Sequence, residues 1–172
     1  MELENYIRHI PGFPKEGILF HDIMPMLQRP EALRYAVDTL AGFAREREAD
    51  LILGAEARGF ILGAAMAYSL NVGFATARKP GKLPYTVQRC EYDLEYGTDV
   101  LEMHIDAIQP GQRVVIHDDL LATGGTAAAK VRLVEDAGGV VAGLAFLIEL
   151  TDLGGRARLE GYEVFSMLQY PY

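Results

Sequence analysis

Residues 113–126 constrain the fold of this chain more than any other segment. Residues 113–117 are mainly apolar and predict a buried strand, which leads directly into Asp118 and Asp119. A loop of small residues then runs to Thr126 and opens a predicted helix. Backbone N–H groups point outward at such a helix start, where the helix dipole favours an anion. The segment therefore predicts a phosphate-binding turn between a strand and a helix.

The acidic pair narrows the choice of ligand. Carboxylates repel phosphate, so sugar hydroxyls or a cation must lie between the acidic pair and a bound phosphate. A ribose 5-phosphate fits both parts of the motif, with its hydroxyls at the carboxylates and its phosphate at the loop. A Walker A loop is excluded because no lysine follows Gly124-Gly125 and because Phe60 follows the similarly spaced glycines of residues 54–59. The chain also lacks the Gly-x-Gly-x-x-Gly pattern of dinucleotide sites. The alternative for the acidic segment is an ordinary loop capped by threonine and glycine.

Predicted strands and helices alternate along the chain. Strands are expected at 50–53, 72–77, 101–105, 113–117, 140–150 and 162–168, and helices at 2–9, 31–47, 58–70, 126–137 and 152–159. Nearly continuous runs of Val, Ile and Leu are typical of parallel strands covered on both faces. We therefore predict a single α/β domain, residues 1–172, with a central, mainly parallel sheet flanked by helices. Ligands bind such sheets at the carboxyl ends of the strands, where residues 54–59, 78–82 and the acidic pair should converge.

Composition bounds the partners and the compartment. The chain has 172 residues, a formal net charge of -8 and a pI of about 5.0, which disfavours nucleic acid or an anionic membrane as the main partner. The single cysteine, Cys90, allows no internal disulfide and fits a reducing cytosol. The acidic start of the chain is unlike a signal peptide, and the apolar runs are too short to span a bilayer. We expect a cytoplasmic protein.

Several charged residues lie where strands are expected to end. Arg58 follows a predicted strand in a glycine-flanked turn and is a candidate for binding a second phosphate; a surface arginine is the alternative. Arg78, Lys79 and Lys82 form a basic cluster in a Pro/Gly loop, which either closes over a polyphosphate or is a solvated loop face. One carboxylate of the acidic and aromatic stretch 91–97 is a candidate general acid or base, although spacing does not choose among them.

Other residues give weaker signals. Phe20 is a candidate for stacking on a planar ligand, but a core phenylalanine is the commoner outcome. The four histidines, His9, His21, His104 and His117, have no metal-ligand spacing with one another, so the sequence predicts no structural metal site.

Taken together, these motifs resemble the type I phosphoribosyltransferases, and the resemblance covers nearly the whole chain. The matching segments are Phe13-Pro14, Gly17–Ile23, Ala57–Phe60, Arg78-Lys79, Gly81–Pro84, Leu94–Gly97, Asp118–Thr126, Leu147–Leu150 and Leu168–Tyr170. The Asp118–Thr126 loop is specific to the superfamily. Leu94-Glu95-Tyr96-Gly97 and Leu168-Gln169-Tyr170 point to the branch that uses adenine.

The resemblance implies a reaction and a set of roles. Adenine and phosphoribosyl pyrophosphate (PRPP) would give AMP and pyrophosphate, with Mg²⁺ held through PRPP and water and by no direct protein ligand. An N-terminal hood (about 1–30) and a flexible catalytic loop (about 78–103) would flank the sheet of a homodimeric enzyme. Ala122, Thr123, Gly124, Gly125 and Thr126 would bind the 5-phosphate; Arg58, Arg78, Lys79 and Lys82 the pyrophosphate; Leu19, Phe20, His21 and Leu120 the adenine. Asp118 and Asp119 would face the ribose hydroxyls, and Glu95 would handle the purine proton.

Two residues depart from the family pattern, and two alternatives stay open. His21 stands where arginine is familiar, and His117 where an apolar residue is expected. A 6-oxopurine substrate would call for a donor such as lysine, and outside the Arg78 loop none precedes a predicted strand end. A regulator of this fold would need an added basic nucleic-acid-binding module, for which the chain is too short and too acidic.

Overall fold

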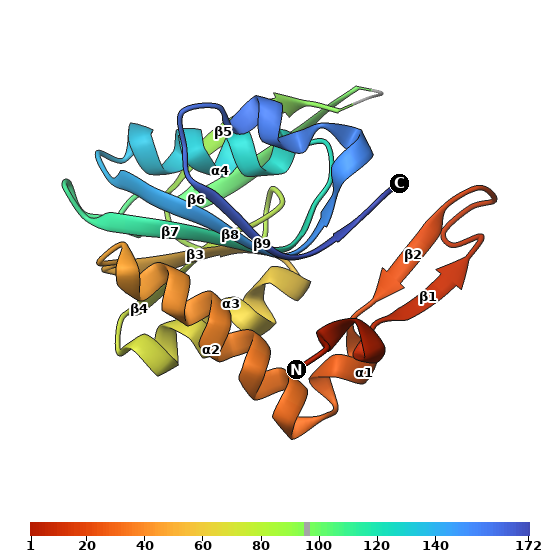
Figure 1. The fold of residues 1–172 in the computed structure, drawn as a ribbon. Coiled ribbons are helices and arrows are strands. Elements are labelled where there is room, and N and C mark those ends of the chain that lie inside the picture. Colours follow the sequence, from red (N-terminus) through yellow and green to blue (C-terminus); the bar gives the residue numbers. More distant parts are fainter. Residues whose placement is uncertain (95–96) are drawn as a thin grey trace.

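A five-stranded sheet forms the centre of the computed structural model, which describes residues 1–94 and 97–172 (Figure 1). The strand order is β4-β3-β7-β8-β9, and every neighbouring pair is parallel. The five strands are β3 (Leu51–Ala55), β4 (Gly73–Ala77), β7 (Arg113–Leu121), β8 (Val140–Leu150) and β9 (Val164–Tyr170). The predicted α/β class is confirmed.

Helices cover both faces of this sheet. Helices α2 (Pro30–Glu46) and α3 (Arg58–Leu70) lie on one face, and α4 (Gly125–Asp136) lies on the other (Figure 1). Helix α2 buries Ala36, Leu40 and Ala44 because residues four positions apart share one helix face. Two hydrophobic cores result, one beneath α2 and α3 and one beneath α4. Among the described residues, no helix is both long and apolar enough to cross a membrane.

Two antiparallel hairpins lie outside the central sheet. The first, β1 (Arg8–Pro11) with β2 (Leu19–Asp22), projects beside the C-terminal end of the chain (Figure 1). The second, β5 (Val87–Asp93) with β6 (Thr98–His104), packs against α4. The remaining elements are α1 (Met24–Leu27) and short 3-10 helices at Leu3–Tyr6, Thr151–Leu153 and Gly155–Leu159.

Most predicted elements differ from the observed ones by a few residues at their ends, and the helix expected at 152–159 is two short 3-10 helices. Three further differences are larger. The strand expected at 101–105 belongs to the second hairpin, which also brings regular structure into the segment 78–99. The helix expected at 2–9 is a single 3-10 turn, and His9 lies in β1. The strand expected to end at residue 117 continues to Leu121, because β8 is long enough to pair with it as far as Leu121↔Glu149. Both aspartates therefore lie within a strand and not in a loop.

Candidate active site at the carboxyl end of β7

A cavity of about 270 Å³ opens at the carboxyl ends of the central strands. It is formed by the end of β3 and the turn after it, by Lys79 beyond β4, and by the segment from the end of β7 to the start of α4. The three segments predicted to converge therefore do so. The predicted residues that line it are Arg58, Lys79, Asp118, Asp119, Leu120, Ala122, Thr123, Gly124, Gly125 and Thr126.

The acidic pair at the end of β7 is held by two cations from opposite faces of the sheet. Lys130 on α4 places its Nζ 2.7 Å from Oδ2 of Asp118, and Arg58 at the start of α3 places its Nε 2.7 Å from Oδ2 of Asp119. The backbone N–H of Asp119 donates to Oδ1 of Asp118 at 3.0 Å. Burial, followed by the charge of Asp118, raises the pKa of Asp119 to about 7. Burial therefore disfavours the ionised form of Asp119, and the charge of Arg58 offsets part of this effect.

His117 lies directly before the pair and is completely buried. Its Nδ1 and the carbonyl oxygen of Ala145 are 2.9 Å apart, so Nδ1 carries the proton and donates. Its Nε2 has no hydrogen-bond partner among the described residues. Burial lowers the pKa of His117 to about 4, so the ring is neutral at physiological pH and does not titrate into the cavity there.

The loop after β7 presents unpaired backbone donors to the cavity. Among the described residues, the N–H groups of residues 123–126 donate to no acceptor. Gly124 holds the sharp turn with a φ of +84°, and α4 begins at the next residue. The loop rests on Gly155, because a Cβ added to Gly124 would lie 2.5 Å from the carbonyl oxygen of Gly155. Orphan N–H groups at the start of a twelve-residue helix form an anion-binding seat.

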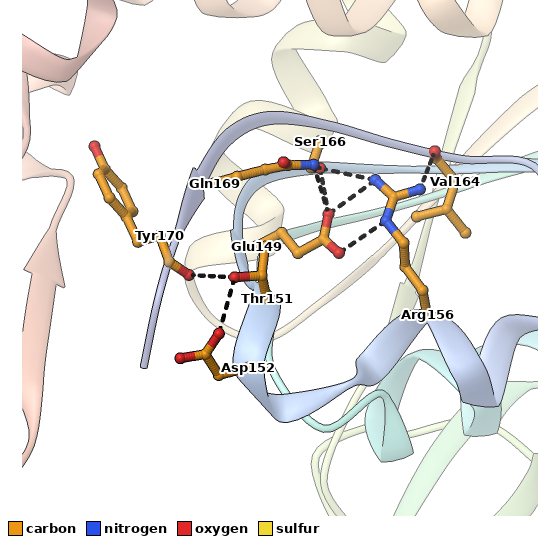
Figure 2. A network of polar contacts seen from close by, with 8 residues as sticks. All are labelled: Glu149, Thr151, Asp152, Arg156, Val164, Ser166, Gln169 and Tyr170. Carbon is orange, nitrogen blue, oxygen red and sulfur yellow. Dashed lines mark hydrogen bonds and ion pairs between the residues drawn. The ribbon is translucent and has the colours of Figure 1, made fainter.

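A polar network around the buried carboxylate of Glu149 fixes the segment that supports this loop. Figure 2 shows Glu149 at the end of β8 accepting from the guanidinium of Arg156, with Nε and Nη2 each 2.8 Å from a carboxylate oxygen. Ser166 donates to the same carboxylate at 2.5 Å. Burial raises the pKa of Glu149, but the hydrogen bonds from Arg156 and Ser166 outweigh it, so the net shift is downward. Because Arg156 follows Gly155 directly, the network anchors the backbone on which Gly124 rests.

An apolar pocket of about 80 Å³ adjoins the cavity. The first hairpin contributes Leu19, Phe20 and His21, and Leu120 comes from β7. Arg58, Asp119 and Leu120 line both hollows, so the two are neighbours along one groove. The Arg58 guanidinium lies 5.3 Å from the centre of the Phe20 ring, within the range of a cation–π contact. All four residues predicted to bind adenine thus line one pocket.

Of the three residues in the predicted basic loop, Arg78, Lys79 and Lys82, one lines the cavity. Lys79 lines the cavity and its ammonium contacts Asp99 and Tyr92. Arg78 and Lys82 lie outside the lining: Arg78 pairs with Glu56 at 3.2 Å, and Lys82 is exposed. The backbone N–H of Lys79, followed by the Arg78 side chain, lowers the pKa of Glu56 against the effect of burial. Glu95 lies outside the described residues.

Sequence reasoning missed Lys130, Glu56, Tyr92 and Arg156 as parts of this arrangement. A charged residue on the apolar face of a predicted helix was an available signal for Lys130, since Ala129 and Val131 beside it and Ala127 and Leu133 three residues to either side are all buried. Glu56 lies between the glycines of residues 54–59, yet only Arg58 stood out there. Tyr92 and Arg156 meet their partners Asp99 and Glu149 seven residues away and on different elements, so no local pattern revealed them.

Comparisons with known proteins agree with this architecture. The model of the phosphoribosyl transferase domain family matches residues 26–168, and that is the class of protein the fold and the site define. An adenine phosphoribosyltransferase of Caldicellulosiruptor saccharolyticus is 56% identical over 170 residues, which cover 99% of this chain and 97% of that protein. The chain belongs to the adenine phosphoribosyltransferase family.

Solved structures show the same likeness. The crystal structure of adenine phosphoribosyltransferase from Thermoanaerobacter pseudethanolicus is 53% identical, with a TM-score of 0.95 and 98% of each chain covered. That from Saccharomyces cerevisiae, complexed with adenine and an iminoaltritol bisphosphate, is 39% identical, with a TM-score of 0.91 and 96% of each chain covered. The resemblance inferred from the sequence motifs is confirmed.

Proposed function

We propose that this chain transfers the 5-phosphoribosyl group of PRPP to adenine, giving AMP and pyrophosphate. One observation carries the proposal: a seat of unpaired N–H groups, a pair of carboxylates and an apolar pocket follow one another along a single groove. A 5-phosphate, a ribose and a purine have the same three chemical characters in the same order. The adenine phosphoribosyltransferases that match nearly the full length of the chain support adenine as the base.

The groove assigns a role to each group of residues. Residues 122–126 bind the 5-phosphate through backbone N–H groups, and Asp118 and Asp119 accept from the ribose hydroxyls. Arg58 and Lys79 bind the pyrophosphate, while Arg78 and Lys82 reach it only if the loop that carries them moves. Phe20 and Leu120 hold the faces of the purine, and backbone groups of Leu19 and His21 read its edge. Because that reading uses the backbone, histidine in place of arginine at position 21 is tolerated.

The chemistry follows from where charge develops. The bond between C1 of the ribose and the pyrophosphate oxygen breaks, and its electron pair leaves on pyrophosphate. C1 acquires oxocarbenium character, as in glycoside hydrolysis, and Asp118 and Asp119 stabilise it electrostatically. N9 of adenine then forms the new bond to C1 and loses its proton, which Glu95 accepts. Water must be kept from C1 during this step, which a closing loop achieves.

Magnesium fits the donor set of the cavity. Mg²⁺ prefers hard oxygen ligands and keeps several waters, and the carboxylates of Asp118, Asp119 and Glu56 line the cavity as acceptors for such waters. Asp118 and Asp119 are already engaged by Lys130 and Arg58, so we propose no direct protein ligand. When bound, Mg²⁺ neutralises charge on the pyrophosphate and makes it a better leaving group.

We also propose that the enzyme is a cytoplasmic homodimer. A buried, free Cys90 suits a reducing compartment. Ile61 and Tyr68 on α3 are exposed, Tyr68 to 91%, and offer apolar surface to a second copy. Analytical ultracentrifugation tests the dimer directly, and a monomer at micromolar concentration contradicts it.

Pyrophosphate release tests the proposed reaction. The protein is mixed with Mg²⁺, PRPP and adenine, hypoxanthine, guanine or xanthine in separate reactions. We expect release with adenine, and little with the three 6-oxo bases. Preference for a 6-oxo base would overturn the substrate assignment, and no release with any base would overturn the activity.

A further inference from the structure

Lys130 is a fully buried lysine that the proposed reaction does not use. Its side chain is 0% exposed, on the face of α4 that packs against the sheet. Lysine is almost never buried to this extent unless it is paired, because removing an ammonium from water is costly. Its burial also means that Lys130 does not touch a substrate in the cavity. Any contribution it makes must pass through a neighbouring group.

That neighbour is the first aspartate of the acidic pair. Nζ of Lys130 lies 2.7 Å from Oδ2 of Asp118 and 3.4 Å from the carbonyl oxygen of His117. The other oxygen of Asp118 accepts the backbone N–H of Asp119. On the far side, a Cβ added to Gly59 would lie 2.7 Å from Oδ1 of Asp118. The carboxylate is therefore held at both oxygens and has little room to rotate.

The charge of Lys130 reduces the repulsion between the acidic pair and an anionic substrate. Two adjacent carboxylates repel a substrate that carries several phosphate charges, and a cation nearby reduces that repulsion. Arg58 pairs with Asp119, but its side chain is 38% exposed and it faces the groove, where substrate competes for it. Lys130 is buried, so its charge stays with Asp118 whether or not substrate is bound.

We propose that Lys130 is a positioning residue for phosphoribosyl transfer: it fixes the Asp118 carboxylate against the ribose and supplies a permanent counter-charge that lets anionic PRPP bind beside two carboxylates. The inference rests on the proposed function, because it assumes that PRPP occupies the groove. The proposal therefore predicts that Lys130, acting through Asp118, affects the binding of PRPP and not that of adenine.

The central test compares K130M with the unaltered protein. Methionine retains most of the volume of the lysine and removes its charge. We expect kcat/KM for PRPP to fall about tenfold or more, the equivalent of one pK unit of interaction, with KM for adenine changed less than about twofold. R132M is the matched control, because it removes an exposed cation from the same helix, and we expect its kinetics to stay within about twofold of the unaltered protein.

The pH profile separates positioning from mere support of the fold. Burial and the charge of Asp118 raise the pKa of Asp119, while Arg58 and Lys130 lower it. Loss of Lys130 should therefore move the acid limb of kcat/KM for PRPP to higher pH. A purely structural lysine would change the melting temperature and leave this limb in place. The other titratable or charged groups lining the cavity, Glu56, Lys79 and Tyr92, are unaltered in every variant.

Two further measurements complete the test. In a D118N background, K130M should cause little additional loss of kcat/KM for PRPP, because the lysine acts through Asp118.

If K130M does not fold, ¹⁵N NMR of the lysine side chains in the unaltered protein decides the question. We expect a charged Lys130 ammonium at pH 7 that is protected from exchange, and a neutral amine overturns the proposal. An unmoved acid limb, or equal losses with and without Asp118, also overturns it. Failure of the unaltered protein to use adenine overturns the proposed function instead, while PRPP binding by K130M still tests the lysine.

Discussion

His9 and His21 lie opposite one another in the first hairpin with their Nδ1 atoms 2.9 Å apart, so the two rings share one proton between them. The His21 ring also stacks on Tyr170, with ring centres 4.4 Å apart and planes 7° from parallel. This contact joins the hairpin that bears the apolar pocket to the last strand of the central sheet. Protonation of both rings would place two positive charges in contact and leave neither Nδ1 free to accept the shared hydrogen bond.

Acid should therefore weaken adenine binding. Burial, followed by the charge of His9, lowers the pKa of His21. The stabilisation from this contact is therefore present above the usual histidine pKa of 6.5 and is lost as the pH falls below it. The charged or titratable groups nearby are Glu4, Arg8, Asp22, Arg58, Asp119, Tyr170 and Tyr172. We expect KM for adenine, at saturating PRPP, to rise roughly threefold between pH 7.5 and 5.5.

The H9N variant tests whether the histidine pair causes this rise. Asparagine does not titrate in this range, so we expect the pH dependence of KM for adenine to flatten. H104N, which alters a histidine of β6 outside the pocket lining, is the control and should retain it. A rise of the same size in H9N would show that another group is responsible.

Loss of the Glu149 charge should loosen the phosphate-binding loop. In E149Q the amide cannot accept both guanidinium donors of Arg156, and Arg156 loses its ionic partner. Because the Arg156 side chain is 44% exposed, solvent screens part of the loss, so we expect a fall of about 1–2 kcal/mol in the free energy of unfolding. Urea titration measures the stability, and KM for PRPP should rise with it. A loss of stability with KM for PRPP unchanged would separate the network from the loop.

A methyl group at Gly124 should disrupt the same loop more severely. In G124A the Cβ would lie 2.5 Å from the carbonyl oxygen of Gly155, and the backbone has a left-handed φ. We expect a loss of about 2–4 kcal/mol in unfolding free energy and weak PRPP binding, measured by urea titration and calorimetry. G154A isolates the effect of φ, because Gly154 has a φ of +64° with nothing within 4 Å of its Cβ position. Equal losses in both variants would argue against the steric role of Gly155.

Glu95 should affect turnover more than binding. If it accepts the N9 proton, E95Q removes the base while PRPP still binds the loop and the acidic pair. We expect kcat to fall by about 100-fold or more, with the dissociation constant of PRPP changed by less than about threefold. E91Q in the same acidic stretch is the control. Comparable losses in turnover and in PRPP affinity for E95Q would contradict the assigned role.

The sequence by itself determined the central sheet, its covering helices and the position of the phosphate-binding loop. These follow from local patterns: apolar runs that need burial on both faces, helix periodicity, and small residues at a helix start. Strand 140–150 and helix 58–70 were predicted to the residue because their apolar patterns end where solvent exposure begins. Candidate residues in the loop and the acidic pair could be named because they are contiguous in the chain.

Tertiary structure alone decided which charges meet. Lys130 with Asp118, Arg156 with Glu149 and Arg78 with Glu56 are separated by 12, 7 and 22 residues, and each pair forms because folding brings different elements together. Local patterns indicate where a side chain lies along its own element, but they do not specify which distant group neutralises its charge. Packing decided this, and in doing so it made Lys130 part of the site and left Lys82 at the surface, because a buried charge requires a partner and an exposed one does not.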